Sequence, residues 1–234
     1  VLEIGCGWGG FAEYAVRTRG CRWTGITISQ AQLGHARERI RAAGLEERVE
    51  LRFQDYRDLE GQYDRIVSVE MFEHMRNYRE LFRRIAGWLN PGGRFFMHIF
   101  CHRSCAYEFV DEGPADWMGR HFFSGGIMPS DDLPLRFQED LRLLRRDRWN
   151  GRHYQRTANA WLENMDRRRD AILPIMAATY GDDHGEQWFQ RWRIFFMACA
   201  ELFGLEEGRE WYVAHYLFAR REDAAGAVDG DARS

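Results

Sequence analysis

Hydrophobic residues follow two different spacings along the first hundred residues. Short runs rich in valine, isoleucine and leucine predict strands at 1–4, 21–28, 49–53, 64–69 and 94–100. Apolar residues three or four positions apart predict helices at 11–19, 30–43 and 78–89. Ser29 is the expected N-cap of the second helix, and Asn90-Pro-Gly-Gly93 is expected to end the third. This alternation predicts an α/β fold with a doubly wound, mostly parallel sheet and helices on both faces.

The pattern changes after residue 100. Residues 101–160 are rich in aromatic and loop-forming residues, 155–205 predict two long helices, and 211–218 predict a closing strand. We therefore expect a core at 1–100, an inserted cap of helices and loops at 101–210, and a closing core strand at 211–220. The tail at 221–234 is rich in alanine, glycine and aspartate and is expected to be disordered. A cap in this fold class covers the carboxyl edge of the sheet, where ligands bind.

Composition restricts the class of protein. Hydrophobic residues make up 45% of the 234 positions, which is enough for a buried core, and the net charge of −3 argues against a nucleic-acid partner. The chain contains no lysine, which excludes a lysine Schiff base. Five cysteines without a secretory signal indicate a reducing compartment, so we expect a cytoplasmic location. Because the chain opens at Val1 inside an apolar run, we expect it to lack an N-terminal part.

A glycine motif follows the first predicted strand. Glu3-x-Gly5-x-Gly7-x-Gly9 precedes a helix, and its glycines permit a tight turn and close approach of the backbone to a ligand. The same turn serves NAD, FAD and S-adenosylmethionine, and it also occurs as a purely structural turn. An NAD site needs an acid at the end of the second strand. That place reads Gly25-Ile-Thr-Ile-Ser29, so the sequence disfavours NAD.

An ionisable cluster follows the fourth predicted strand, at the expected carboxyl edge of the sheet. Glu70-Met-Phe-Glu73-His74 places three titratable groups within five residues. Such groups can take a proton from an amine or stabilise a cationic one. The alternative is that these acids start a helix, where the helix dipole favours them. That alternative explains Glu73 but not the whole cluster.

Several motifs in order carry a family resemblance. VLEIGCGWGG, GITISQAQ, QDYRD and YDRIVSVEMFEHM resemble the cyclopropane-fatty-acyl-phospholipid synthase superfamily of S-adenosylmethionine-dependent methyltransferases. HIFCH, RHFFSGGIMPS, NGRHYQRT, AELF and EWYVAHYLF resemble its coclaurine N-methyltransferase branch most. The resemblance runs from Val1 to about Arg220. It implies the Rossmann-like class I methyltransferase fold, without the helical N-terminal region of the family.

The resemblance also implies a set of residues that bind S-adenosylmethionine. They are Gly5 and Gly7, with Cys6 between them, for the methionine part, Thr27 and Gln32 for the ribose side, and Gln54, Asp55 and Tyr56 for the adenine. A carboxylate beside backbone groups can bind the adenine amine, and Tyr56 offers a flat face. Asp55 taken alone is equally typical of a surface turn. Its neighbours and its place after a strand favour the binding role.

Glu70 separates two substrate classes. By the resemblance, lipid cyclopropane synthases carry a small residue here, whereas the amine enzymes carry glutamate. A carboxylate suits a cationic amine and poorly suits an apolar acyl chain, because a buried unpaired charge is costly. We therefore predict a methyltransferase that N-methylates a small aromatic or benzylic amine, with Glu70, Glu73 and His74 orienting and deprotonating it.

The runner-up is cyclopropane formation on unsaturated phospholipid acyl chains at a membrane surface. The resemblance implies that Cys6, Glu73, His98 and Tyr154 would surround a bicarbonate base. These positions also occur in the amine branch and do not discriminate, and His98 is equally compatible with a core histidine. A non-catalytic binding domain is a third alternative, which the Glu–His cluster disfavours. A homodimer stays open.

Two further groups are candidate ligand sites. His98-x-x-Cys101-His102-x-x-Cys105 resembles a metal cluster, but its spacing fits no standard finger, and we expect no metal. Aromatic rings in the predicted cap can hold a cationic amine through cation–π attraction. The candidates are Trp117, His121, Phe122 and Phe123, which lie in a loop-rich stretch, whereas Trp188, Trp192 and Phe196 have the spacing of packed helix residues.

Overall fold

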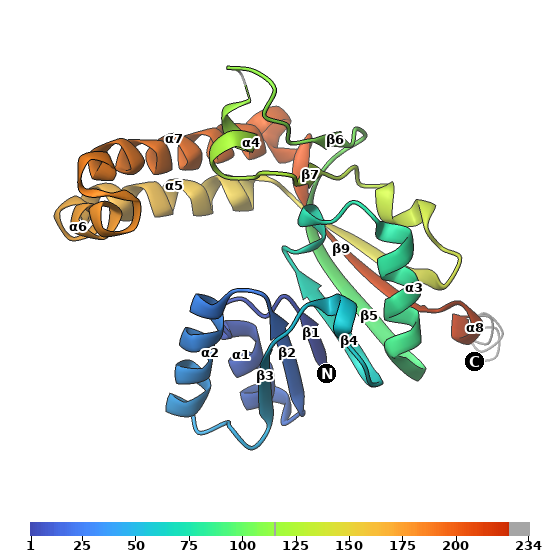
Figure 1. Ribbon diagram of the computed structural model, residues 1–234. Coiled ribbons are helices and arrows are strands. Elements are labelled where there is room, and N and C mark those ends of the chain that lie inside the picture. Colours follow the sequence, from blue (N-terminus) through green and yellow to red (C-terminus); the bar gives the residue numbers. More distant parts are fainter. Residues whose placement is uncertain (115, 225–234) are drawn as a thin grey trace. The chain divides into compact units, whose positions relative to one another are not determined.

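The computed structural model describes residues 1–114 and 116–224 (Figure 1). Its main sheet has seven strands in the order β3-β2-β1-β4-β5-β9-β8, and a second sheet pairs β6 with β7. The strands are β1 (Leu2–Ile4), β2 (Trp23–Thr27), β3 (Val49–Phe53), β4 (Tyr63–Val69), β5 (Leu89–His102), β6 (Tyr107–Glu108), β7 (Ile127–Met128), β8 (Leu141–Trp149) and β9 (Trp211–Arg220). The α-helices are α1 (Gly10–Arg19), α2 (Gln30–Ala42), α3 (Tyr78–Trp88), α4 (Trp117–His121), α5 (Arg152–Arg167), α6 (Arg169–Tyr180), α7 (Gly185–Gly204) and α8 (Arg221–Ala224).

The first five strands form the predicted doubly wound arrangement. β1 pairs in parallel with β2 on one side and with β4 on the other, and the parallel pairs β2–β3 and β4–β5 extend the sheet. The chain therefore reverses its direction of winding between β1 and β4. In sheets of this kind, ligands bind beyond the carboxyl ends of the strands at such a reversal. The predicted α/β class is confirmed.

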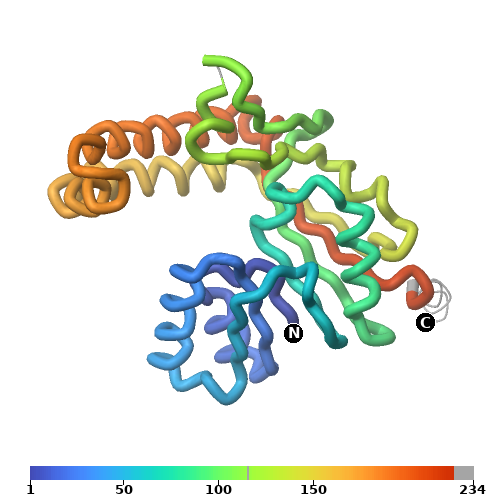
Figure 2. Tube along the Cα trace, viewed as in Figure 1, coloured from blue at the N-terminus to red at the C-terminus, as the bar shows by residue number. Residues whose placement is uncertain are grey.

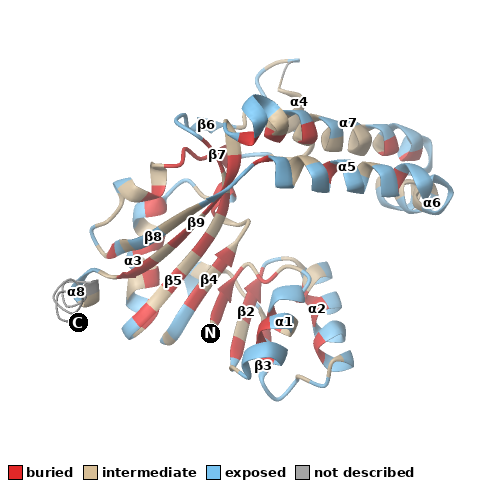
Figure 3. Cartoon of the chain, turned by 180° about the vertical axis from the view of Figure 1, so that it is seen from behind, coloured by how far each residue is buried: buried red, intermediate tan, exposed pale blue. Residues whose placement is uncertain are grey.

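Strand register shows that helices cover both faces of this sheet. Trp23 pairs with Val49, and both belong to a core cluster that α1 and α2 complete with small and aliphatic side chains. The next residue, Thr24, lies on the opposite face of the sheet. On that face it pairs with Leu2, Leu2 pairs with Ile66, and Ile66 pairs with Phe95. There the Phe82 ring of α3 lies 6.0 Å from the Phe95 ring. Figure 3 shows buried residues concentrated along the sheet strands.

Some elements differ from those predicted. Hydrophobic alternation does not reveal β8, because four of its nine residues are arginine and one is aspartate. The region expected to hold two long helices holds α5, α6 and α7, with breaks at Arg168 and Gly181. The turn expected at 90–93 lies within β5, where the pairing with β4 is shifted. Residues 221–224, the start of the predicted tail, form α8, and 225–234 lie outside the described residues.

The chain divides into two compact units. The first comprises Val1–Ile99, Asp132–Asp147 and the chain from Ala214 onward, and the second comprises Phe100–Asp131 and Arg148–Val213. Each unit therefore consists of more than one segment of the chain, whose trace Figure 2 shows in sequence colours. The expectation that residues 101–210 form a cap stays a prediction. Within the described parts of the chain, no helix has the length and apolar character needed to cross a membrane.

The first unit buries a carboxyl group beneath the glycine turn. Glu3 on β1 is 3% exposed, and its Oε2 accepts a hydrogen bond of 3.0 Å from the Trp23 indole nitrogen. Burial raises the pKa of Glu3 from 4.5 to about 7, although the Trp23 hydrogen bond opposes the shift. The folded state therefore favours the protonated acid. Its contribution to stability is complete below pH 4.5 and is lost as pH rises through about 7.

We predict that Glu3→Gln removes this pH dependence. Since a glutamine side chain cannot ionise, the variant should gain free energy of unfolding relative to wild type between pH 5 and pH 8, by up to about 3 kcal/mol. Urea denaturation at the two pH values measures the difference, with the exposed Glu47→Gln as control. An equal difference between variant and wild type at both pH values would show that Glu3 is ionised in the fold.

Candidate functional site

A pocket of about 440 Å³ lies in the first unit, at the carboxyl ends of four neighbouring strands. β1 and the turn after it contribute one part of the wall, and the segments after β2, β3 and β4 contribute the others. The lining residues extend from position 4 to position 75 of the sequence, and the parallel sheet brings them to one edge. The lining residues are Ile4, Gly5, Gly7, Ile26, Thr27, Ile28, Gln32, Gln54, Asp55, Tyr56, Val69, Glu70, Met71, His74 and Met75.

The glycine turn brings backbone to the pocket. Gly5 and Gly9 have φ angles of 84° and 76°, in the left-handed region that favours glycine. A Cβ on Gly9 would lie 2.9 Å from the Cβ of Ala36, so the turn also packs against α2. The amides of Gly5 and Cys6 donate to the Ile26 carbonyl at 3.1 and 2.9 Å. The turn is therefore fixed to β2 as well as to β1.

Hydrogen bonds at the start of α2 orient the polar wall after β2. The Thr27 hydroxyl donates to Oε1 of Gln32 at 3.0 Å and accepts from the Ser29 amide at 3.1 Å. Ser29 is the N-cap of α2, as predicted, and its side chain accepts from the Gln32 amide. Thr27 and Gln32 thus face the pocket in a fixed arrangement.

The segment after β3 supplies a carboxylate and an aromatic ring. Asp55 caps a short 3₁₀ turn, and its Oδ1 accepts from the Arg57 amide at 2.8 Å. Its Oδ2 pairs with the Arg57 guanidinium at 2.9 Å, and this hydrogen bond lowers the pKa of the Asp55 carboxyl. The Gln54 side chain donates to the Asp58 carbonyl at 2.9 Å. An ionised acid therefore stands beside Tyr56 at the pocket wall.

Glu70 occupies an unusual backbone conformation at the end of β4. Its φ is 54°, in a region that costs a non-glycine residue about 1–2 kcal/mol. Two contacts with His98 on β5 hold it there. The Glu70 amide donates to the His98 carbonyl at 3.1 Å, and Oε1 of Glu70 lies 2.8 Å from Nε2 of His98. Strain of this kind concentrates at functional sites.

His74 completes the ionisable wall of the pocket. It ends the short 3₁₀ turn Phe72–His74, four residues after Glu70. Burial lowers the pKa of His74, and the nearby Glu70 carboxylate partly opposes this shift. The neutral imidazole is the form that can accept a proton.

Four predicted site residues lie elsewhere. Glu73 is fully buried in the turn and does not line the pocket. The Cys6 side chain packs in the core with α1 and α2, and burial raises its pKa to about 12, so its assignment to cofactor contact stays a prediction. His98 reaches the site through Glu70. Tyr154 belongs to α5 of the second unit, where its ring centroid lies 4.6 Å from that of Phe203.

Sequence reasoning does not find one further residue, His215 on β9. Its Nε2 lies 3.0 Å from Nδ1 of His98, which connects it to Glu70. Burial and the neighbouring His98 lower the pKa of His215 to about 4. The two histidines are 117 residues apart, so no local spacing could pair them. The available signal is a histidine with apolar and aromatic residues on both sides of it in the strand.

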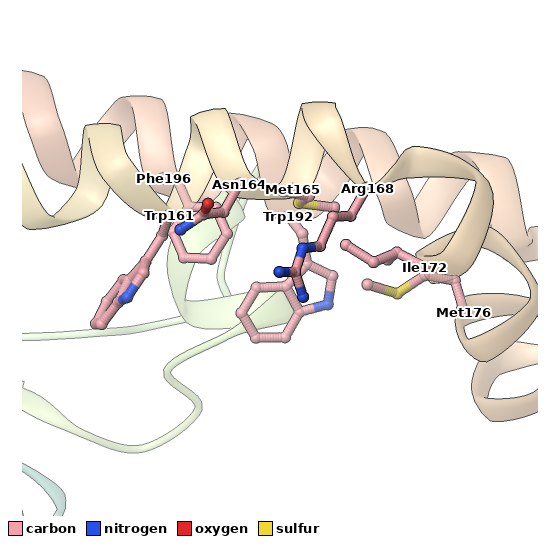
Figure 4. Close-up of a pocket in the computed structure, with 8 residues that line it drawn as sticks. All are labelled: Trp161, Asn164, Met165, Arg168, Ile172, Met176, Trp192 and Phe196. Carbon is pink, nitrogen blue, oxygen red and sulfur yellow. The ribbon is translucent and has the colours of Figure 1, made fainter.

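The second unit contains a separate pocket of about 600 Å³ (Figure 4). Trp161 from α5 and Trp192 and Phe196 from α7 line it, and Arg168 from the break before α6 points into it. Trp192 packs against the rings of Phe122, Phe195 and Phe196, as its spacing predicts, and Trp192 and Phe196 also line this pocket. Among the predicted substrate aromatics, Phe122 instead stacks on Phe195 of α7 with ring centroids 4.6 Å apart.

The predicted metal-like cluster has another arrangement. Nε2 of His102 lies 2.8 Å from Oε1 of Glu210, and Nδ1 of His102 accepts from the amides of Ser104 and Cys105. These contacts fix the exit of β5. Across residues 1–114 and 116–224, no three His, Cys, Asp or Glu side chains are grouped so that they could hold a metal ion.

Comparison with known proteins agrees with this geometry. Residues 1–210 match the family of mycolic acid cyclopropane synthetase. An (S)-coclaurine N-methyltransferase of Papaver somniferum is 33% identical over 227 residues, covering 94% of this chain and 64% of that protein. A cyclopropane-fatty-acyl-phospholipid synthase of Escherichia coli is 34% identical over 217 residues, covering 91% of this chain and 52% of the relative. The chain thus spans less than two thirds of these relatives.

Solved structures give the same result. Coclaurine N-methyltransferase bound to N-methylheliamine and SAH superposes with a TM-score of 0.87 at 32% identity, covering 93% of this chain and 66% of that one. The cyclopropane synthase MmaA2 of Mycobacterium tuberculosis shares the fold, with a TM-score of 0.79 at 21% identity over 93% of this chain and 76% of that one. The resemblance predicted from the motifs is confirmed. Because the family match runs over 210 of 234 residues and the structures superpose, the chain belongs to the mycolic acid cyclopropane synthetase family, with the fold of class I S-adenosylmethionine-dependent methyltransferases.

Proposed function

We propose that the protein is an S-adenosylmethionine-dependent methyltransferase that N-methylates a small amine. One observation carries the proposal. The Glu70 carboxylate lines the same pocket as the glycine turn, at a strained backbone position that His98 stabilises. Similarity to coclaurine N-methyltransferases supports the amine as acceptor. We propose further that this amine is aromatic or benzylic. The homodimer and the cytoplasmic location stay predictions.

The pocket residues fit S-adenosylmethionine in chemistry. The glycine turn, with Gly5 and Gly7 at the pocket, leaves room for the methionine part, and the Thr27–Gln32 pair offers hydroxyl and amide groups toward a ribose. Asp55 and Tyr56 offer an acceptor and a flat ring toward an adenine. When bound there, S-adenosylmethionine supplies an electrophilic methyl group on a sulfonium centre.

Glu70 and His74 fit the needs of an amine acceptor. An amine attacks only through its lone pair, so a protonated amine must first lose a proton. His74 is suited to take it, because burial lowers the pKa of His74 and keeps the imidazole neutral at neutral pH. The Glu70 carboxylate attracts the ammonium form and then orients the amine nitrogen.

Cyclopropane formation on phospholipid is the second candidate. Similarity to the Escherichia coli synthase favours it, and Glu73 and His98 are both present in the first unit. Two described features favour the amine instead. A carboxylate at the pocket wall suits a cation better than an acyl chain. Cys6, one of the residues implied for a bicarbonate site, packs in the hydrophobic core.

Transfer of labelled methyl groups tests the proposal. We expect purified protein to label a tetrahydroisoquinoline-type amine and not vesicles of unsaturated phospholipid. Glu70→Gln should lower kcat for the amine by about 10²-fold, because it removes the charge that binds and orients the acceptor. Binding of S-adenosylmethionine, measured by calorimetry, should remain, and Glu47→Gln serves as surface control. Label in the lipid, unaffected by Glu70→Gln, would reverse the assignment.

Backbone strain at Glu70 can be tested separately. Glu70→Gly and Glu70→Ala both remove the carboxylate, but only glycine adopts a φ of 54° at little cost. We expect the glycine variant to have the larger free energy of unfolding, by about 1 kcal/mol, in urea denaturation. The same pair of substitutions at Glu47, which is exposed and has no positive φ, should favour alanine or show no difference. Equal stabilities of the Glu70 variants would remove strain from the account.

A further inference from the structure

A row of three side chains leads away from the pocket. Oε1 of Glu70 lies 2.8 Å from Nε2 of His98, and Nδ1 of His98 lies 3.0 Å from Nε2 of His215. The residues come from the end of β4, from β5 and from β9, which are adjacent in the sheet. All three belong to the first unit. Both ring nitrogens of His98 are therefore engaged, one toward the pocket and one away from it.

The chemistry of these groups determines which atom donates and which accepts in each hydrogen bond of the row. A carboxylate only accepts hydrogen bonds, so Nε2 of His98 must carry the proton that it shares with Glu70. A neutral His98 then has an unprotonated Nδ1, which is an acceptor. The contact with His215 therefore requires the proton on Nε2 of His215. Glu70 and His215 therefore favour the same tautomer of His98, and each contact adds to its population.

The surroundings of His215 favour the neutral donor that this row needs. Burial and, after it, the charge of the neighbouring His98 lower the pKa of His215 to about 4, while Asp147 partly opposes this shift. The Phe96 ring meets the imidazole in a T-shaped arrangement, with centroids 5.1 Å apart. The two imidazoles lie with centroids 4.9 Å apart and planes tilted by 38°. His215 is thus held between an aromatic ring and His98.

We propose that His215 is a positioning residue for the reaction. Nε2 of His215 donates a hydrogen bond to Nδ1 of His98 and so favours the His98 tautomer that carries its proton on Nε2. That proton then points to the Glu70 carboxylate. This inference rests on the proposed function, because the purpose of the row is to hold the Glu70 carboxylate toward the acceptor. The Glu70 side chain is 35% exposed and its backbone is strained, so it needs such support. Histidines oriented by a second partner work in this way at other sites.

Nitrogen NMR of histidine-labelled protein measures the tautomer directly. At pH 8, we expect wild-type His98 to show protonated Nε2 and unprotonated Nδ1, with its signals assigned by their absence in His98→Gln. In His215→Leu, which removes the donor, the His98 signals should change toward a mixture of tautomers. His215→Gln retains an amide donor of similar reach and should keep the wild-type pattern. An unchanged His98 tautomer in a folded His215→Leu variant would overturn the proposal.

Kinetics provide the second readout. His215→Leu should lower kcat by about 10-fold or more with little change in S-adenosylmethionine affinity, and His215→Gln should recover most of the loss. In a Glu70→Gln background, His215→Leu should have no further effect, since its action passes through Glu70. Exposed His184→Gln is the matched control. Additive losses, or no rescue by glutamine, would indicate a packing role only. Absence of amine methylation in wild type would refute the proposed function, whereas the NMR result would still decide the role of His215.

Discussion

The site depends on the contacts between Glu70, which directly follows β4, and His98, which lies within the neighbouring strand β5. Backbone and side chain of Glu70 both bind His98, at 3.1 and 2.8 Å, and together they hold a non-glycine residue at a φ of 54°. Without these contacts the carboxylate would lose a defined direction, because the relaxed backbone would turn it elsewhere. Strand pairing thus sets the position of the carboxylate on which the proposed amine function rests.

The parallel sheet places the remaining groups around that charge. β1 and β2 bring the glycine turn and Thr27, β3 leads into Asp55, and β4 leads into Glu70, all at one edge. Because these strands are buried and paired, each side chain is attached to a rigid strand end rather than to a long loop. In the proposed function, the groups offered to a cofactor and those offered to an acceptor therefore lie at the same sheet edge, which suits a transfer between two bound molecules.

Much of the first unit could be predicted from sequence, since its signals are local. Strand and helix periods, the cap Ser29 and the glycine turn each depend on a few adjacent residues. Non-local features could not be predicted. β8 carries too many arginines to show alternation, and His215 meets His98 only after the sheet forms. The motif also gives the position of Cys6 in the turn but not the direction of its side chain, which packs in the core.

The most direct measurement is a crystal structure of the protein with S-adenosylhomocysteine and a tetrahydroisoquinoline-type amine. The account predicts the amine nitrogen within hydrogen-bonding distance of the Glu70 carboxylate or the His74 imidazole, with Glu70 still at positive φ and bound to His98. An amine bound away from both side chains, or a Glu70 that leaves His98 and turns out of the pocket, would contradict the central claim.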